Sequence, residues 1–201
     1  MMSNGTVSAP RQASSPAVEL NVGETLGGRY EIVERIGEGG FAVVWKALDR
    51  ITNTPVAIKI LRSKHAADNS YRSRFFRGAH TMATLRHSSI VRVLEPELFD
   101  KGHHFFVMEL VEGGDLRRAV QLNQLKPELI TKILIKIGAA LSYAHERSLV
   151  HRDVKPANIL LRFIEDPLLS DFDVRSVSHK WQCQGLGTGM RKEGKEASLI
   201  T

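Results

Sequence analysis

Short apolar runs separated by glycine or polar clusters fill the chain from residue 29 to residue 111. The first three runs, residues 29–37, 42–50 and 54–62, are rich in β-branched and aromatic residues. They are broken by the glycine cluster at residues 37–40 and by the sequence ITNT. This pattern predicts an antiparallel meander of three strands.

A helical period then separates the meander from two more strand candidates. Residues 70–87 place their apolar side chains near one helical face, and residues 90–99 and 103–111 return to short β-rich runs. The strongest helical pattern covers residues 127–146, where Pro127 suits the first turn. The apolar positions are Phe75, Phe76, Ala79, Met82, Ala83 and Leu85 in the first helix and Ile130, Ile133, Leu134, Ile137, Leu141 and Ala144 in the second.

The order of these elements indicates an α+β chain with two lobes. Strands with one helix come first and helix dominates afterwards, so a ligand cleft is expected between the lobes. We expect a small lobe and its connection at residues 26–112 and a second lobe at residues 113–175. Residues 1–25 and 176–201 lack sustained apolar periodicity and are expected to be disordered tails.

Composition narrows the class of protein further. With 42% hydrophobic and 25% charged residues, the chain is typical of a globular protein. Its formal charge of +6 is spread along the chain without an aromatic-interleaved basic patch, which argues against a nucleic-acid partner. The single cysteine, Cys183, is consistent with a reducing compartment, and no run approaches the roughly 20 apolar residues of a membrane span. We therefore expect a cytoplasmic protein without a membrane segment.

The glycine cluster is the first candidate for chemistry. In GEGGFAVV, residues 37–44, glycines between two antiparallel strands let backbone N–H groups approach phosphate oxygens. A plain glycine-rich hairpin turn explains the loop equally well. Lys59 favours the phosphate hypothesis, because it ends the apolar strand VAIK and would place an ammonium in the cleft under the loop. The alternative for Lys59 is an ordinary exposed lysine.

The segment HRDVKPAN carries the most specific signal. His151, Arg152, Asp153 and Asn158 fit the spacing H-R-D-x-x-x-x-N, and SDFD supplies a second acid at Asp171. Phosphoryl transfer from ATP needs an acid to orient the attacking hydroxyl and oxygen ligands to hold Mg²⁺. A lysine just after that acid stabilises charge on the transferred group. A polar loop after a helix is the alternative, and it does not explain the match in order, type and spacing.

On these motifs the chain resembles the eukaryotic-like protein kinases, of the Ser/Thr branch, from about residue 30 to residue 173. The resemblance implies a two-lobed fold with a complete antiparallel β small lobe carrying one helix and an incomplete helical large lobe. It implies the cofactors ATP and Mg²⁺ and a protein substrate with a Ser or Thr hydroxyl, with a partner kinase as a further candidate partner. The catalytic group would be Asp153, Lys155 and Asn158, and the metal ligands would be Asn158 and Asp171.

The resemblance also implies a nucleotide site. Lys59 would contact the α- and β-phosphates, and Met108 would stand just before the hinge that binds adenine. The implied phosphate loop and its flanks are Ile36, Gly37, Glu38, Gly39, Gly40, Phe41, Ala42 and Val44, and the implied adenosine contacts are Ala57, Met108, Glu109, Val111, Asp115 and Leu160.

The chain departs from the family pattern at four places. Ala42 replaces the third loop glycine, and Asp173 replaces the glycine of the DFG triplet. The helix position expected to hold a glutamate partner for Lys59 is Gly78, which leaves Asp171 as the candidate partner. The residues after Asp171 contain neither an APE triplet nor any proline.

These departures lead us to expect a truncated Ser/Thr kinase domain. The helix at residues 127–146 should then expose apolar surface and lower the solubility of the chain. Three alternatives remain open: a non-catalytic pseudokinase-like module that binds nucleotide or a partner, a small-molecule kinase of related fold, and a gene remnant without function.

Overall fold

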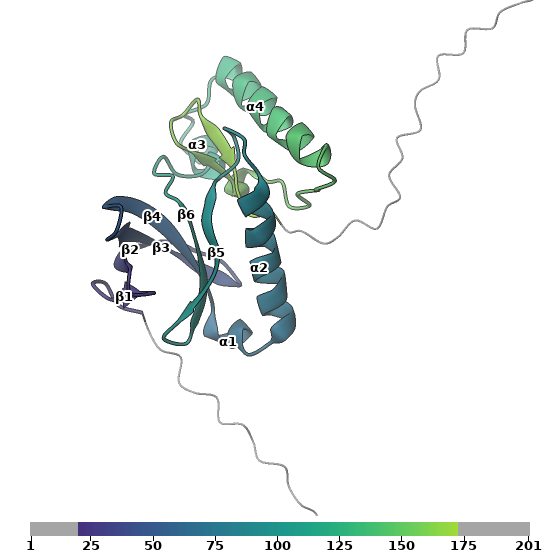
Figure 1. Cartoon of the computed structure of the whole chain (residues 1–201). Helices are drawn as coiled ribbons and strands as arrows, with labels where there is room; N and C mark the ends of the chain where they lie inside the picture. Colours follow the sequence, from purple (N-terminus) through teal and green to yellow (C-terminus); the bar gives the residue numbers. More distant parts are fainter. Residues whose placement is uncertain (1–19, 173–201) are drawn as a thin grey trace, which may run out of the picture.

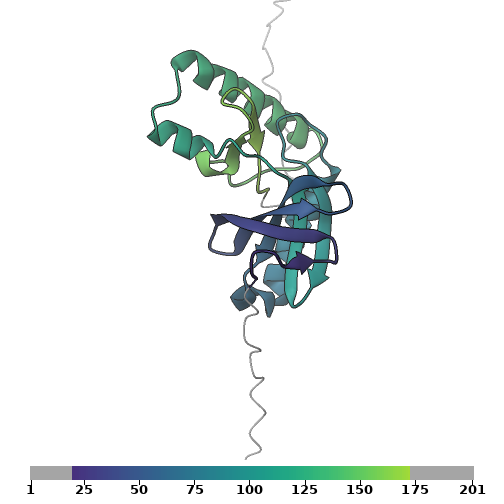
Figure 2. The same cartoon turned by 90° about the vertical axis from the view of Figure 1, so that its left-hand side faces the viewer.

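The computed structural model describes residues 20–172, and its elements form two groups that match the two expected lobes (Figure 1, Figure 2). The small lobe holds a six-stranded antiparallel sheet in the order β1-β2-β3-β4-β6-β5. Its strands are β1 (Thr25–Leu26), β2 (Tyr30–Glu38), β3 (Ala42–Asp49), β4 (Thr54–Leu61), β5 (Val93–Asp100) and β6 (His103–Glu109).

Two helices connect β4 to β5. The first, α1 (Ser63–Ala66), is a single turn that the sequence pattern did not predict, since four residues are too few to show a helical period. The second, α2 (Asn69–Thr84), is capped at its N-terminus by Asp68, whose carboxylate accepts a hydrogen bond from the Ser70 N–H. The prediction of one small-lobe helix therefore holds for α2 and omits α1.

The small lobe begins before residue 26, where the sequence analysis placed its boundary. Leu20 packs against the sheet, and the Gly23 N–H donates to the Ile32 carbonyl at 2.8 Å. Thr25 already pairs with Glu31 as the start of β1. Of the tail expected at residues 1–25, residues 1–19 lie outside the described residues, as do the tail expected at residues 176–201 and Asp173.

The large-lobe part contains fewer elements. It comprises α3 (Leu116–Gln121), α4 (Pro127–His145), the 3-10 turn Pro156–Asn158, and the two-stranded sheet β7 (Ile159–Leu161) and β8 (Pro167–Leu169). The predicted helix at residues 127–146 is confirmed as α4, and the sequence analysis did not predict the short elements α3, β7 and β8.

The hydrophobic core has two parts, one within the small lobe and one between the lobes. One cluster, with Leu26, Ile58 and Phe105 at its centre, lies within the sheet of the small lobe. The other joins α2 to the large-lobe part, because Met82 and Val93 share a buried cluster with Ile137 and Leu168. The second cluster fixes how the two lobes meet and so positions the groups between them.

Candidate functional site

The loop after α4 holds Asp153 in a defined orientation. Lys155 Nζ donates to Asp153 Oδ2 at 2.6 Å, and Asn158 Nδ2 donates to the same oxygen at 2.9 Å and to the Asp153 carbonyl at 2.8 Å. The Lys155 ammonium is the main cause that holds the pKa of Asp153 below its usual range. Among the described residues, none donates to Oδ1, so the second oxygen has no partner in this part of the chain.

His151 anchors that loop as a neutral ring. It is buried, and its Nε2 lies 2.7 Å from the Ser170 carbonyl while its Nδ1 accepts the Asp153 N–H at 3.3 Å. One ring nitrogen therefore donates and the other accepts, which is the neutral tautomer. Burial lowers the pKa of His151 and agrees with that state. The histidine of the motif is structural and ties Asp153 to β8.

Lys59 and Asp171 form a direct ion pair across the cleft. Lys59 comes from β4 and is mostly buried, whereas Asp171 follows β8 and keeps 41% of its side chain exposed. Asp171 has φ of 58° and Arg152 has φ of 65°, in the left-handed region that non-glycine residues seldom occupy. One unusual backbone conformation is thus at Asp171 itself and the other is directly before Asp153. The pairing expected between Lys59 and Asp171 is confirmed.

A cavity of about 250 Å³ brings three of the predicted groups together. Lys59, Asp153 and Asp171 line it beside Phe41 of the glycine loop. Gly78 also lines it, at the helix position that the family pattern places beside Lys59. The other lining residues were not predicted to belong to the site, and they are Leu61, Tyr71, Arg74, Phe75, Ala79, Met82, Phe106 and Phe172. Most of them belong to α2, whose apolar pattern by itself predicted a core face.

The glycine loop is a tight turn between β2 and β3, as predicted. Within it the Gly39 N–H donates to the Ala42 carbonyl at 2.9 Å. Arg62, at the end of β4, donates to the Gly39 carbonyl at 2.9 Å and pairs with Glu38. No motif singles out Arg62, because only the fold brings it under the loop.

The tip of the loop is fastened to the two small-lobe helices. The Phe41 ring packs on His65 at 4.9 Å and on Tyr71 at 5.5 Å between centroids. The His65 ring nitrogen Nε2 lies 3.3 Å from the Gly40 carbonyl. A Cβ added at Gly40 would meet nothing within 4 Å, and the residue does not have positive φ. Nothing in the described fold requires glycine there, which leaves room for a ligand.

The residues predicted to hold the adenine lie next to this cavity, toward the connection between the lobes, and do not line it. Ala57 pairs with Met108 across β4 and β6, and both share a hydrophobic cluster with Val44, Val111 and Leu160. Ala57 comes from the small lobe and Leu160 from the large-lobe part, so the cluster spans the cleft.

The side chains of two polar residues of the predicted set are engaged within the fold, whereas the adenine contact expected of Glu109 is through its backbone. Glu109 accepts the Arg92 N–H with Oε1 at 2.8 Å and pairs with Arg162 through Oε2 at 2.9 Å. Asp115 caps α3 by accepting the Arg118 N–H at 2.8 Å. The Val111 N–H, by contrast, donates to no acceptor within residues 20–172. The backbone N–H of Val111 is therefore available to a ligand.

The candidate metal ligands, Asn158 and Asp171, offer the oxygen atoms that Mg²⁺ prefers. Asn158 uses its Nδ2 for both bonds to Asp153, which leaves its Oδ1 as the side-chain atom available to a cation. Together with the Asp171 carboxylate this gives two protein oxygen ligands, and Mg²⁺ commonly takes the rest from phosphates and water. Residues 20–172 contain no cluster of three or more His, Cys, Asp or Glu side chains suited to a metal.

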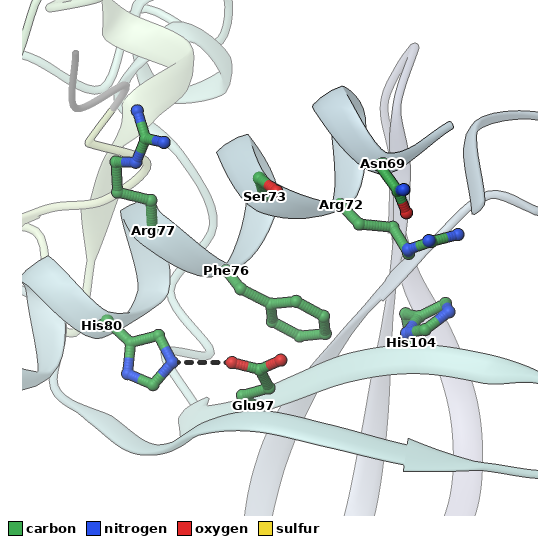
Figure 3. A pocket seen from close by; sticks show the side chains of 8 residues that line it. All are labelled: Asn69, Arg72, Ser73, Phe76, Arg77, His80, Glu97 and His104. Atoms are coloured by element: carbon green, nitrogen blue, oxygen red, sulfur yellow. Dashed lines mark hydrogen bonds and ion pairs between the residues drawn. The ribbon is translucent and has the colours of Figure 1, made fainter. Parts of the chain in front are cut away.

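A second cavity, of about 500 Å³, lies on the outer face of α2 against β5 and β6 (Figure 3). Its charged groups do not converge on one point. His80 pairs with Glu97 at 2.8 Å, Arg72 donates to the Ala66 carbonyl, and Arg77 points away from both (Figure 3). This cavity lacks the catalytic groups described above.

No helix among residues 20–172 is long and apolar enough to cross a membrane.

Comparison with known proteins gives a consistent result. A model of the protein kinase domain matches residues 30–188. The chain is 38% identical over 158 residues to serine/threonine-protein kinase PrkC of Bacillus subtilis, and the alignment covers 76% of this chain and 24% of PrkC. It is 37% identical over 155 residues to serine/threonine-protein kinase PknL of Mycobacterium tuberculosis, covering 76% of this chain and 39% of PknL. The chain thus spans well under half the length of these two relatives.

Solved structures give the same answer for the fold. The crystal structure of the Mycobacterium tuberculosis PknI kinase domain superposes with a TM-score of 0.66 at 31% identity, over 79% of this chain and 63% of that chain. A second structure, the apo form of PpkA-294, superposes with a TM-score of 0.70 at 23% identity.

Proposed function

Since the chain belongs to the protein kinase domain family, we propose that its cleft binds Mg²⁺-ATP and serves transfer of the γ-phosphate to a Ser or Thr hydroxyl of a protein. The observation that carries the proposal is the geometry around Asp153. Its Oδ2 is fixed by Lys155 and Asn158, its Oδ1 accepts no hydrogen bond from residues 20–172, and it lines the same cavity as Lys59 and Asp171.

The proposed reaction assigns one task to each group. Asp153 Oδ1 accepts the hydrogen bond of the substrate hydroxyl and takes its proton as the hydroxyl oxygen attacks the γ-phosphorus. The bond between that phosphorus and the bridging oxygen breaks, and ADP leaves. Lys155 lies 2.6 Å from Asp153 and can stabilise negative charge on the transferred group.

The Lys59–Asp171 ion pair suits Mg²⁺-ATP, because this ligand offers phosphate oxygens to Lys59 and a cation to Asp171. Mg²⁺ held by Asp171 and Asn158 would neutralise the phosphates, and Lys59 would bind the α- and β-phosphates. Each partner of the ion pair then exchanges one opposite charge for another, so neither is left uncompensated. Val111 would receive the adenine, and Ala57 and Leu160 would enclose it. Asp115 would reach the ribose with Oδ2, the oxygen that does not cap α3 and that pairs with the exposed Arg117 at 3.3 Å.

A second candidate is a module that binds nucleotide or a partner protein without turnover. The observation that favours it is the absence of an α2 carboxylate beside Lys59, where the helix presents Gly78.

Thermal melts with and without Mg²⁺-ATP, followed by a phosphotransfer assay on generic protein substrates, test these proposals. Ligand at 100 times its dissociation constant should add about 2.7 kcal/mol to the free energy of unfolding. Lys59→Ala should lose that Mg²⁺-dependent shift. Asp153→Asn should keep the shift and abolish transfer, because the amide cannot take the hydroxyl proton.

The outcomes separate the two candidates. Transfer by the wild type that Asp153→Asn loses supports the kinase. A nucleotide-induced shift without any transfer supports the second candidate, and no shift at all contradicts nucleotide binding.

A further inference from the structure

Gly78 lies at a contact between α2 and the segment that carries Asp171. It is buried and lines the cavity that holds Lys59 and Asp171. A Cβ built on Gly78 would stand 2.9 Å from the backbone carbonyl oxygen of Phe172. Atoms in folded proteins do not approach a Cβ that closely, and this neighbour is backbone, which cannot rotate away as a side chain can. The helix therefore meets Phe172 at a distance that only glycine allows.

Phe172 is also held by its side chain. The side chain is buried, and its ring packs on His151 with 4.4 Å between centroids. His151 in turn lies 2.7 Å from the Ser170 carbonyl. Because the Phe172 ring is packed against the loop that carries Asp153, a side chain at position 78 would have to displace a residue that is anchored in the fold.

Displacement of Phe172 acts directly on Asp171, the residue before it. Asp171 has φ of 58° and pairs with Lys59. A shift of the following peptide changes where that carboxylate lies relative to Lys59 and to Asn158.

We propose that Gly78 is a positioning residue, whose bare backbone seats the Phe172 carbonyl against α2 and so sets the Asp171 carboxylate for Lys59 and for the metal. Any side chain at position 78, a carboxylate included, moves Asp171 out of place. The effect on metal binding rests on the proposed function, whereas the effect on the Lys59–Asp171 pair does not.

The competing explanation treats Gly78 as a lost glutamate. It predicts that Gly78→Glu gives Lys59 its missing partner and improves Mg²⁺-ATP binding. Our proposal predicts that Gly78→Glu weakens Mg²⁺-ATP binding, so this one variant separates the two explanations.

The chain offers a matched control in Gly138. It lies inside α4 as Gly78 lies inside α2, and a Cβ added there would meet nothing within 4 Å. Alanine is the better helix former at both places. Gly138→Ala should therefore raise the melting temperature and leave ligand binding unchanged, while any loss in Gly78→Ala reports the contact with Phe172.

The first experiment titrates Mg²⁺ at fixed ATP and follows the melting temperature of the wild type, Gly78→Ala, Gly78→Glu and Gly138→Ala. Loss of a group that orients a metal ligand typically weakens metal binding about 10- to 100-fold, and we expect a shift of this size in the Mg²⁺ midpoint for both Gly78 variants. A Gly78→Glu midpoint equal to or below that of the wild type would overturn the proposal.

The second experiment needs no nucleotide. An amine-reactive ester is used to label lysines, and the rate at Lys59 is read by mass spectrometry, with Asp171→Asn as the reference for an unpaired Lys59. Gly78→Ala should raise the Lys59 rate toward that reference and leave the exposed Lys132 unchanged. An unchanged Lys59 rate in a folded Gly78→Ala contradicts the proposal even if the wild type binds no ATP. Should Gly78→Glu fail to melt cooperatively, Gly78→Ala carries both tests.

Discussion

The sheet core of the small lobe and helix α4 of the large-lobe part bury their apolar residues to very different extents. In the small lobe, Phe105 and Ile58 are fully buried within a six-stranded sheet. In the large-lobe part, α4 buries Ile133 and Ile137 but leaves Leu134 65% exposed and Ile135 66% exposed. The predicted exposure of apolar surface on this helix is confirmed. A strong apolar pattern in the sequence therefore identifies a helix or strand, but it does not show how much of its apolar surface other parts of the protein bury.

The candidate site combines residues from a buried sheet with residues from loops of the less buried part. The small lobe supplies a sheet that fixes Lys59 and the glycine loop, while the acids lie on loops of the less buried part. We therefore expect the scaffold of the nucleotide site to be the more stable half, and three predictions test this comparison.

The largest effect should come from Phe105→Ala in the small lobe. Phe105 is fully buried among Leu26, Ile32 and Ile58, and such truncations cost about 3–5 kcal/mol. Urea denaturation followed by fluorescence or circular dichroism measures the loss. Phe99→Ala on β5 is the control, because Phe99 is mostly exposed and the change should stay within about 0.5 kcal/mol. Equal losses would show that the sheet core does not dominate the stability of the chain.

A smaller effect should appear on acidification, and it should also come from the small lobe. The buried Asp49 carboxylate accepts hydrogen bonds from Arg29 at 2.7 and 2.6 Å, and this guanidinium holds the pKa of Asp49 well below its usual range. A folded-state pKa below the unfolded value of about 3.9 stabilises the fold above that pH, and the contribution is lost as pH falls. The melting temperature should therefore drop between pH 6 and pH 3.

Asp49→Asn tests the source of that drop. It should lower the melting temperature at pH 6 and flatten the pH profile. Glu165→Gln, at an exposed position of the large-lobe part, should leave the profile as it is. A wild-type slope retained by Asp49→Asn would assign the acid sensitivity to other carboxylates.

The smallest effect on stability should come from Leu134→Lys on α4. Since Leu134 is exposed, the change should stay within about 0.5 kcal/mol, and the loss of apolar surface should raise the solubility limit. The adjacent Ile133→Ala removes a buried side chain and should cost about 2–5 kcal/mol. Solubility by ultrafiltration and urea denaturation measure the two quantities. A destabilising Leu134→Lys would mean that the α4 face is covered in solution.

Much of the candidate site could be predicted because its signals are local. The spacing from His151 to Asn158, the glycines at residues 37–40 and the strand that ends in Lys59 are each contained in a few residues. The strand pattern and the helix at residues 127–146 are local for the same reason, since side-chain periodicity reflects backbone geometry within one element. The roles of these residues in binding and transfer remain predictions.

What the sequence by itself determined is therefore the longer strands and helices, the α+β class and the residue types available for chemistry. The tertiary structure decided which groups meet. Lys59 and Asp171 are 112 positions apart, Arg62 lies under the glycine loop, and Gly78 touches the Phe172 carbonyl. The physical reason is that these contacts depend on how two lobes pack through a shared core, and packing distances between distant segments leave no periodic trace in the chain.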